Sequence, residues 1–183
     1  TLQEQLKSFQ TEILNINKSA ILKPTTITTN NTTINNNNKI LNMSVLNFNN
    51  DDEVKNIIED NYNIDVISEG QKGVARFATD FLLKDENGNL KYVCTDPSRK
   101  IFKYKNNLGE IEKDVNAVKL TSLIADSGVL EATKKMSSEH WTSEDGSIDN
   151  DKFSKLYCKS IEIDSLKDNN TIFKNELVSQ TSI

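Results

Sequence analysis

The stretch from Tyr92 to Lys113, YVCTDPSRKIFKYKNNLGEIEK, constrains the fold of this chain most strongly. Its segments 91–95 and 101–105 are rich in β-branched and aromatic residues, which favour strands. The residues between them, Asp96-Pro97-Ser98-Arg99, fit a type I turn. Proline fixes φ at the second position of such a turn, and the aspartate carboxylate accepts a hydrogen bond from the turn backbone. The two segments are therefore predicted to be paired strands.

A second turn at Asn106-Asn107-Leu108-Gly109 leads to a short third strand at 110–112. Polar residues in the first two strands alternate with Tyr92, Cys94, Phe102 and Tyr104. Alternation with a period of two predicts a sheet with one buried face and one solvated face. A small antiparallel meander needs a covering layer to be stable, so helices are expected to pack on its buried face.

Helices are predicted on both sides of the meander in sequence. Asn50 is a good N-cap for a helix with an acidic first turn, which the helix dipole favours. Ser68-Glu69-Gly70-Gln71 matches a capping box before an apolar stripe with helical spacing. Asp114 is expected to cap a helix through about Ala125, with Gly128 as its stop. Two later helices are expected, one from about Asp149 with Phe153, Leu156, Tyr157 and Ile161 on one face, and one from Asn170.

Three other segments have less regular expectations. Residues 39–48, KILNMSVLNF, predict a strand with both faces covered, and residues 64–67 predict a short alternating segment. The polar link 137–147 contains Trp141, which is expected to attach this loop to the core.

The N-terminus carries a heptad pattern. Apolar residues recur at alternating spacings of four and three, at Leu2, Leu6, Phe9, Ile13 and Ile16. This spacing predicts a coiled-coil oligomerisation helix over residues 1–23, and isoleucine at both core positions favours a homotrimer or homotetramer. The alternative is an ordinary amphipathic helix that packs on its own domain.

Residues 24–50 are expected to form an extended, Thr/Asn-rich stem between this helix and an α+β head at 51–183. The low-complexity run TTITTNNTTINNNN fills positions 25–38. Disorder is the usual interpretation of such a run, but Thr and Ile favour strands, and Asn side chains form ladders between neighbouring chains. In a symmetric oligomer, neighbouring copies of the run are therefore expected to pair.

The 183 residues carry a formal net charge of −5, which argues against a nucleic-acid-binding protein with a broadly basic surface. No apolar run is long enough to span a bilayer, so no membrane partner is expected and the chain is expected to be intracellular. Two distant cysteines and one histidine lack the spacing of a metal site. No glycine-rich phosphate loop or nucleophile–base pair is found either, so we expect no cofactor, no metal and no enzyme activity.

One basic cluster remains as a candidate binding site: Arg99, Lys100, Lys103 and Lys105. Phe102 and Tyr104 lie between them in sequence, and a basic strip with aromatic residues is typical of surfaces that bind a nucleic-acid backbone and stack bases. The structural interpretation is that these are edge-strand charges that discourage aggregation.

The order of a heptad segment, KPTTITTNNTTINNNN, GQKGVARFATDFLL and YVCTDPSRKIFKYKNNLGEIEKD resembles a group of giant DNA virus proteins of the mimivirus kind. The resemblance covers nearly all of the chain. It is most specific at residues 93–99 and 102–105. Members of the group look like an N-terminal zinc-finger-like module, a coiled coil, a Thr/Asn tract and this C-terminal region. The upstream module is absent from this chain.

These features together predict a non-enzymatic scaffold. The heptad helix is expected to assemble copies of the chain, either to multimerise an upstream nucleic-acid-binding module or to form part of a virion. The resemblance implies a location in the virus factory of an infected host or in the virion, with virion proteins as further partners. The alternative function is nucleic-acid binding through the strip at 99–105.

Overall fold

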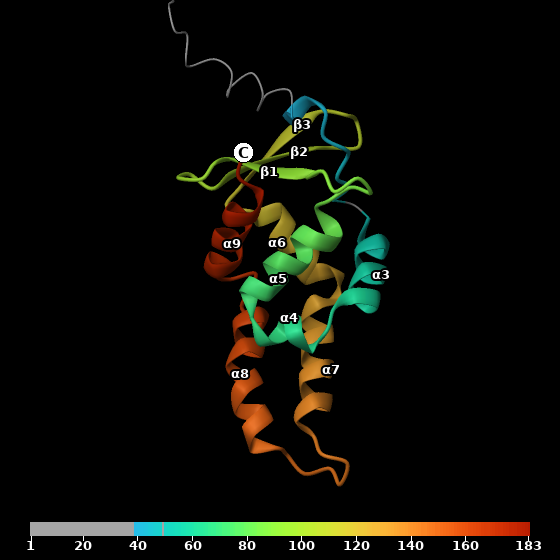
Figure 1. Cartoon of the computed structure of the whole chain (residues 1–183), viewed down its shortest axis with the longest axis vertical. Helices are drawn as coiled ribbons and strands as arrows, with labels where there is room; N and C mark the ends of the chain where they lie inside the picture. The colour runs from blue at the N-terminus through green and yellow to red at the C-terminus, as the bar shows by residue number, and fades with distance from the viewer. Residues whose placement is uncertain (1–38, 49) are drawn as a thin grey trace, which may run out of the picture. The chain divides into compact units, whose positions relative to one another are not determined.

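The computed structural model of the chain describes residues 39–48 and 50–183. These residues combine helices with one three-stranded antiparallel sheet, which confirms the α+β class (Figure 1). They belong to one compact unit, the head. The expected coiled coil at 1–23, with its seam at Leu2, Leu6, Phe9, Ile13 and Ile16, lies outside the described residues, as does the Thr/Asn run.

The elements of the head follow in chain order as α3 (Asp51–Asn61), α4 (Ile64–Ser68), α5 (Gln71–Phe77), η1 (Ala78–Leu82), β1 (Tyr92–Asp96), β2 (Ile101–Lys105), β3 (Ile111–Val115), α6 (Val118–Ile124), η2 (Ala125–Val129), α7 (Leu130–Trp141), α8 (Asn150–Asp164) and α9 (Thr171–Thr181). The two η segments are π-helical turns that continue α5 and α6. Helix α3 begins after Asn50, as predicted, and the Asn50 side chain accepts a hydrogen bond from the Glu53 amide.

The meander is confirmed, with strand order β1-β2-β3. Asp96 Oδ1 accepts a hydrogen bond from the Arg99 amide at 3.0 Å, and the Asn106 carbonyl accepts one from the Gly109 amide at 2.9 Å. Both turns therefore form as their residues predict. The third strand is longer than expected and runs to Val115, where it pairs with Ile101.

The buried face of the sheet is also as predicted, but the opposite face is solvated only in part, because Val93 lies there opposite Lys103 and is buried by Ile40 and Met43. Tyr92, Cys94, Phe102 and Tyr104 are all buried and point toward the helices. The rings of Tyr92 and Phe102 stack at 5.0 Å. Helices α5, α6 and α9 lie below the sheet, and the α7–α8 hairpin extends to the far end of the head (Figure 1).

Residues 39–48 do not form the predicted strand. Residues 39–41 are helical, and the only ladder contact in this segment is a parallel bridge between Val45 and Lys105. Ile40, Met43 and Leu46 are buried, and their spacing of three differs from the period of two that a strand requires. Ile40 and Met43 pack on Val93 of β1, so this segment joins the head, although the expected head began at residue 51.

The capping box predicted at Ser68-Glu69-Gly70-Gln71 is wrong, because Ser68 ends α4 and α5 begins at Gln71. The cap of α5 comes from α8 instead: Glu162 Oε1 accepts a hydrogen bond from the Gln71 amide at 2.9 Å. Gly70 has φ 66°, in the left-handed region that glycine accommodates without strain. The capping partner lies ninety-one positions away in sequence, which no local pattern reveals.

The expected alternating segment at 64–67 is helix α4. The Asn63 side chain caps it by accepting hydrogen bonds from the Asp65 and Val66 amides. Helix α5 then approaches α4 closely, since a Cβ atom at Gly73 would lie 2.1 Å from the Val66 carbonyl oxygen. Only glycine fits at this crossing.

The helix expected after Asp114 begins later, at Val118, because β3 includes Asp114. Asn116 and Ala117 have φ values of 59° and 55° and turn the chain between the two elements. Gly128 has φ 105° but does not stop the chain of helices, since η2 leads directly into α7. Helix α7 continues to Trp141, within the segment expected to be a loop.

The predicted inner face of α8 is partly wrong. Leu156 and Ile163 are its buried residues. Tyr157 and Ile161, which were expected beside Leu156, are 46% and 50% exposed. Trp141 packs against Phe153 with ring centroids 4.9 Å apart and against the main core, so it attaches the end of the hairpin as expected.

Candidate functional site

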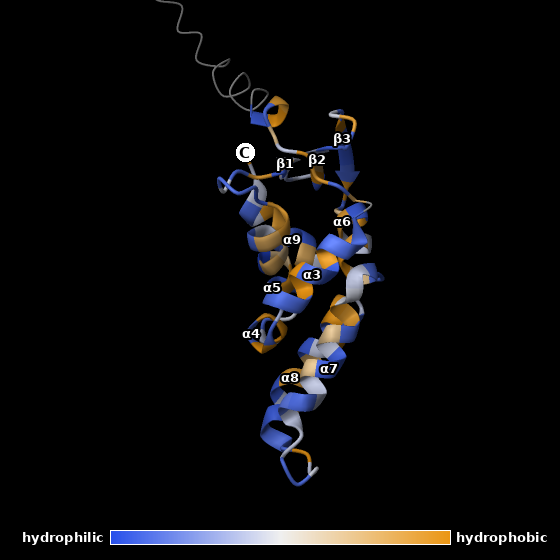
Figure 2. Ribbon diagram, turned by 90° about the vertical axis from the view of Figure 1, so that its right-hand side faces the viewer, coloured by the Kyte–Doolittle hydropathy of each residue, from blue (hydrophilic) through white to orange (hydrophobic). Residues whose placement is uncertain are grey.

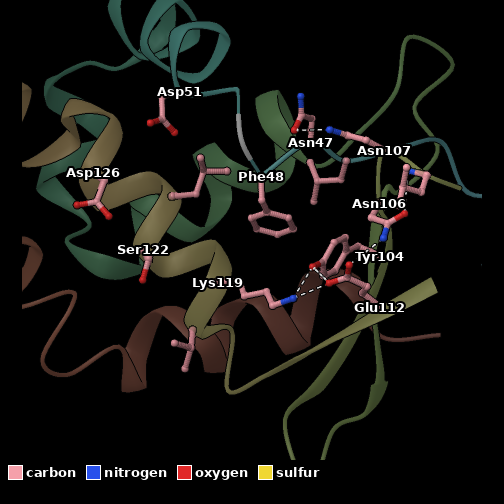
Figure 3. Close-up of a pocket in the computed structure, with 14 residues that line it drawn as sticks. Asn47, Phe48, Asp51, Tyr104, Asn106, Asn107, Glu112, Lys119, Ser122 and Asp126 are labelled. Carbon is pink, nitrogen blue, oxygen red and sulfur yellow. Dashed lines mark hydrogen bonds and ion pairs between the residues drawn. The ribbon is translucent and has the colours of Figure 1, made fainter. Parts of the chain in front are cut away.

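A hollow of about 640 Å³ lies between the segment 46–48, the β2–β3 turn, α3 and α6 (Figure 3). Part of its lining is apolar: Leu46, Phe48, Leu108, Val118 and Leu123. The other part carries amides, carboxylates, one hydroxyl, one phenol and one ammonium: Asn47, Asn106, Asn107, Asp51, Glu112, Asp126, Ser122, Tyr104 and Lys119. This mixture of side chains is typical of a binding site.

Three of these groups form a hydrogen-bonded cluster, seen as dashed lines in Figure 3. Tyr104 Oη donates to Glu112 Oε2 at 2.5 Å, and Lys119 Nζ donates to both atoms, at 2.7 Å and 2.6 Å. The sheet register places Tyr104 directly opposite Glu112. Helix α6 then brings Lys119 to the pair. We call these three residues the Tyr-Glu-Lys cluster.

The cluster holds its charges firmly at neutral pH. Hydrogen bonds from Lys119, and then from Tyr104 and Asn106, lower the pKa of Glu112 to about 2. The hydrogen bond to Glu112 raises the pKa of Lys119 above its ordinary value. Burial, followed by the hydrogen bond to Glu112, raises the pKa of Tyr104. A general acid or base works best with a pKa near the operating pH, so this arrangement favours ion pairing over proton transfer.

The surrounding residues fix the cluster in place. The rings of Phe48 and Tyr104 pack edge to face with centroids 4.5 Å apart, and Lys119 Nζ lies 5.2 Å from the Tyr104 ring centroid. Asn106 Nδ2 donates to Glu112 Oε1 at 2.8 Å, while Asn106 Oδ1 accepts from the Glu110 amide. The β2–β3 turn therefore orients the carboxylate.

A second network lies deeper on the same face of the sheet, around the buried side chains of Tyr92 and Asp114. Tyr92 Oη donates to Asp114 Oδ2 at 2.9 Å, and the amides of Lys119 and Leu120 each donate to the same carboxylate at 3.1 Å. Burial, and then the Asp114 charge, raises the pKa of Tyr92 well above its ordinary value. Asp114 thus accepts hydrogen bonds from amides in the first turn of α6, as the sequence predicted, although Asp114 itself belongs to β3.

The predicted basic strip is divided by the structure. Arg99 and Lys100 lie in the β1–β2 turn, where Arg99 Nε is 3.8 Å from Asp96 Oδ2. Lys105 Nζ donates to the Leu41 carbonyl oxygen at 2.6 Å. Lys103 lies on the outer face of β2, directly opposite Lys113 of β3. Contact of these residues with nucleic acid stays a prediction.

The aromatic part of that prediction is wrong. Phe102 is fully buried and Tyr104 is 3% exposed. Since side chains alternate along a strand, both rings point to the helices while the lysines of β2 point outward. Neither ring is available to stack on a base.

The titratable groups elsewhere in the described chain are scattered. Cys94 is buried, Cys158 is exposed, and His140 lies near the end of α7. Among residues 39–48 and 50–183, no three His, Cys, Asp or Glu side chains are grouped so that they could hold a metal ion. No helix within these residues has the length and apolar character needed to cross a membrane.

Sequence reasoning missed the Tyr-Glu-Lys cluster. Glu112 appeared as a polar residue of the third strand and Lys119 as part of a helix. The available signal was the strand register: a three-residue hairpin loop that ends in Gly109, with φ 80°, pairs Tyr104 with Glu112. The position of Lys119 depends on the turn at Asn116 and Ala117. Asn116 is a typical turn residue, but nothing in the sequence indicates the left-handed conformation of Ala117.

Comparisons with protein-family models, with curated proteins and with solved structures found no significant match to this chain.

Proposed function

We propose that this chain is a non-enzymatic assembly module. The heptad segment at 1–23 joins three or four copies, and each copy presents a head with binding surfaces. The spacing of Leu2, Leu6, Phe9, Ile13 and Ile16 is the observation that carries the proposal. The Tyr-Glu-Lys cluster supports its non-enzymatic part, because the pKa values of Glu112 and Lys119 are moved away from neutrality.

The test is the native mass of the whole chain by analytical ultracentrifugation. Leu6→Asp with Ile13→Asp places charges in the seam, so the trimer or tetramer is expected to dissociate. Ser8→Asp with Asn15→Asp is the matched control, because it adds the same charges to the same segment outside the seam. A mass that is unchanged by the seam substitutions would contradict the proposal.

Nucleic-acid binding is the second candidate function, and the outer face of the sheet supports it. Lys103 and Lys113 have no ion pair with any other described residue. With Phe102 and Tyr104 buried, such a surface would contact phosphates and carry little base specificity.

The test of nucleic-acid binding is the salt dependence of DNA and RNA binding. Each lost phosphate contact, in Arg99→Ala or Lys103→Ala, is expected to reduce the slope of log K against log salt by about 1. Binding that those substitutions leave unaltered would exclude this function.

The resemblance to giant-virus proteins adds a location to the proposal: a virus factory or the virion. Proteolysis and mass spectrometry of purified virions would test this directly. Peptides of the chain inside washed virions would support a virion component, and their absence from virions but presence in factories would support the other location.

A further inference from the structure

Lysines gather on the outer face of the sheet, and carboxylates gather around the loop between α7 and α8. The sheet lies at one end, and the loop between α7 and α8 lies at the other (Figure 1). Figure 2 shows that the ribbon is mostly hydrophilic at both β3 and this loop. The outer face of the sheet presents lysines, whereas the loop and its flanking turns present carboxylates. Positive and negative side chains are thus gathered on two separate surfaces of the same unit.

The first surface, the basic face, consists of Lys103, Lys105, Lys113, Ile111 and Val115. Lys103 and Lys113 lie directly opposite each other on neighbouring strands, and like charges in that position destabilise a sheet. No carboxylate of the described chain pairs with either lysine. Val115 is 52% exposed beside them. Lys105 Nζ donates to the Leu41 carbonyl oxygen, and Ile111 packs against the cluster of Ile40, Met43 and Val93. The basic face therefore combines two unpaired lysines, Lys103 and Lys113, with the accessible apolar area of Val115 at the free edge of β3.

The second surface, the acidic tip, consists of Glu139, Glu144, Asp145, Asp151 and Ile148. All four carboxylates belong to exposed residues, and none of them forms an ion pair with another described residue. Ile148 is 57% exposed among them. The tip repeats, with opposite charge, the composition of the basic face.

Backbone hydrogen bonds give the acidic tip a defined shape. The Ser143 amide donates to the Ser147 carbonyl at 2.8 Å, and the Asp149 amide donates to the Trp141 carbonyl at 2.7 Å. The packing of Trp141 on Phe153 holds the base of this loop. A surface formed in advance loses less entropy on binding than a mobile loop.

We propose that the basic face of one copy binds the acidic tip of a second copy. Because the two surfaces lie at opposite ends of the head, they meet only between molecules. Such a head-to-tail contact is heterologous, and repeating it produces a chain of copies. Charge complementarity steers the encounter and rejects the wrong pairings, tip to tip and face to face.

The contact is expected to be weak in isolation, since interfaces below about 1,200 Å² in total are typically transient. In a molecule whose copies are joined by the N-terminal segment, several such contacts act together and the apparent affinity rises. This inference extends the proposed assembly function to a second type of contact. It does not require the heptad segment to be an oligomer.

Paired charge reversals test the proposal in the full chain. Variant A carries Lys103→Glu and Lys113→Glu, which reverses the two unpaired charges of the basic face. Variant B carries Glu139→Lys and Glu144→Lys, which cancels the negative charge of the four carboxylates of the acidic tip. None of these four side chains forms an intrachain hydrogen bond or ion pair in the described structure, so folding is expected to be retained. Circular dichroism checks this for each variant.

Sedimentation velocity at low salt, over a wide range of concentration, gives the readout. The parent chain is expected to grow with concentration, and A or B alone is expected to lose more than about tenfold in association constant. A mixture of A and B is expected to recover association, because the unaltered acidic tip of A then meets the unaltered basic face of B. Added salt should weaken both the parent and the mixed assembly.

Two controls and a second background separate the alternatives. Lys55→Glu with Lys135→Glu, and Glu59→Lys with Asp60→Lys, reverse equal numbers of exposed charges elsewhere, and neither pair is expected to change association. All variants are also measured in a background that carries Leu6→Asp and Ile13→Asp. In this background the heptad oligomer is already lost, so any further fall in mass comes from loss of the head contact. A mixture of A and B that stays as dispersed as either alone would overturn the proposal. A mass of the parent chain that does not change with concentration would also overturn the proposal. The same holds if variant A loses nucleic-acid binding and the mixture of A and B does not recover self-association.

Discussion

The two faces of the three-stranded sheet use polar residues in opposite ways. On the helix side, Asp114 accepts hydrogen bonds from Tyr92 and from two amides, and Glu112 pairs with Lys119. On the outer side, Lys103 faces Lys113 across the strands with no carboxylate between them. The polar groups of the inner face find their partners within the head, whereas the ammonium groups of Lys103 and Lys113 on the outer face have no partner among the described residues.

The magnitudes explain why the two arrangements coexist. An unsatisfied polar group in the core costs about 1–3 kcal/mol, so a buried carboxylate must have partners. Two like charges opposite each other on a solvated face cost only about 0.2–1 kcal/mol. A folded head therefore tolerates a like-charge pair on its surface, but it tolerates few unsatisfied polar groups in its core. Stability measurements should therefore separate the two faces clearly.

The largest effect is expected from Asp114→Ala. This change leaves the Tyr92 hydroxyl and the amides of Lys119 and Leu120 without an acceptor in the core. The free energy of unfolding should fall by about 3 kcal/mol, measured by urea denaturation. Lys113→Ala on the outer face is the matched control and should change it by less than about 0.5 kcal/mol. Equal losses from the two substitutions would remove the distinction between the faces.

Tyr92→Phe should have the next largest effect. It preserves the ring that stacks on Phe102 but removes the donor to Asp114 Oδ2. The free energy of unfolding is expected to fall by about 1–1.5 kcal/mol. In the Asp114→Ala background the same change should cost much less, because the partner is already missing. Additive losses in this double-mutant cycle would show that the two groups do not interact.

The Tyr-Glu-Lys cluster predicts a dependence of stability on pH. The pKa of Glu112 falls from its ordinary 4.5 to about 2 in the folded head. A lowered pKa means that the contribution of Glu112 is fully present above pH 4.5 and is lost as the pH falls toward 2. The Glu112→Gln variant should therefore show a shallower loss of stability over this interval, measured by denaturation at each pH. Parallel curves for variant and parent would contradict the ion pairing. The effect should be modest, because water screens partly exposed pairs.

The smallest effect has the opposite sign. Lys113→Glu replaces a like-charge pair with an opposite-charge pair across β2 and β3, so the head should become more stable by about 0.2–1 kcal/mol. Thermal denaturation measures this, with Lys55→Glu as the control. The same substitution should weaken head-to-tail association. A change that stabilises the fold while reducing assembly would mark the lysine as retained for contact with a partner.

Much of the sheet was predictable because its signals are local. Pro97 with Asp96, and Asn106 with Gly109, specify turns within four residues. The turns then bring the strands together, although a bulge between Cys94 and Asp96 shifts the register of the first pair. The alternation of polar and apolar residues along the strands identified the buried face, because this signal is local as well. From the register of β2 and β3 the Tyr104–Glu112 pair could have been found as well, although it was not.

The helical part was less predictable where its signals are distant. The cap of α5 comes from Glu162, and the tight crossing at Gly73 depends on the position of α4. The segment 39–48 has the composition of a strand, yet burial of Ile40 and Met43 against Val93 decided its conformation. Intrinsic preference is weak compared with the burial of apolar side chains, so tertiary contacts prevailed.

Local sequence signals were enough to specify the α+β class, the meander and its turns, and the starts of α3 and α8, because those features depend on neighbouring residues. Packing of the whole head was needed to bring together the Tyr-Glu-Lys cluster and the partners of the buried Asp114 carboxylate, and to separate the basic face from the acidic tip. Charges far apart in sequence become partners, or are placed at opposite ends, only when the whole core has packed, since that packing alone sets their distances.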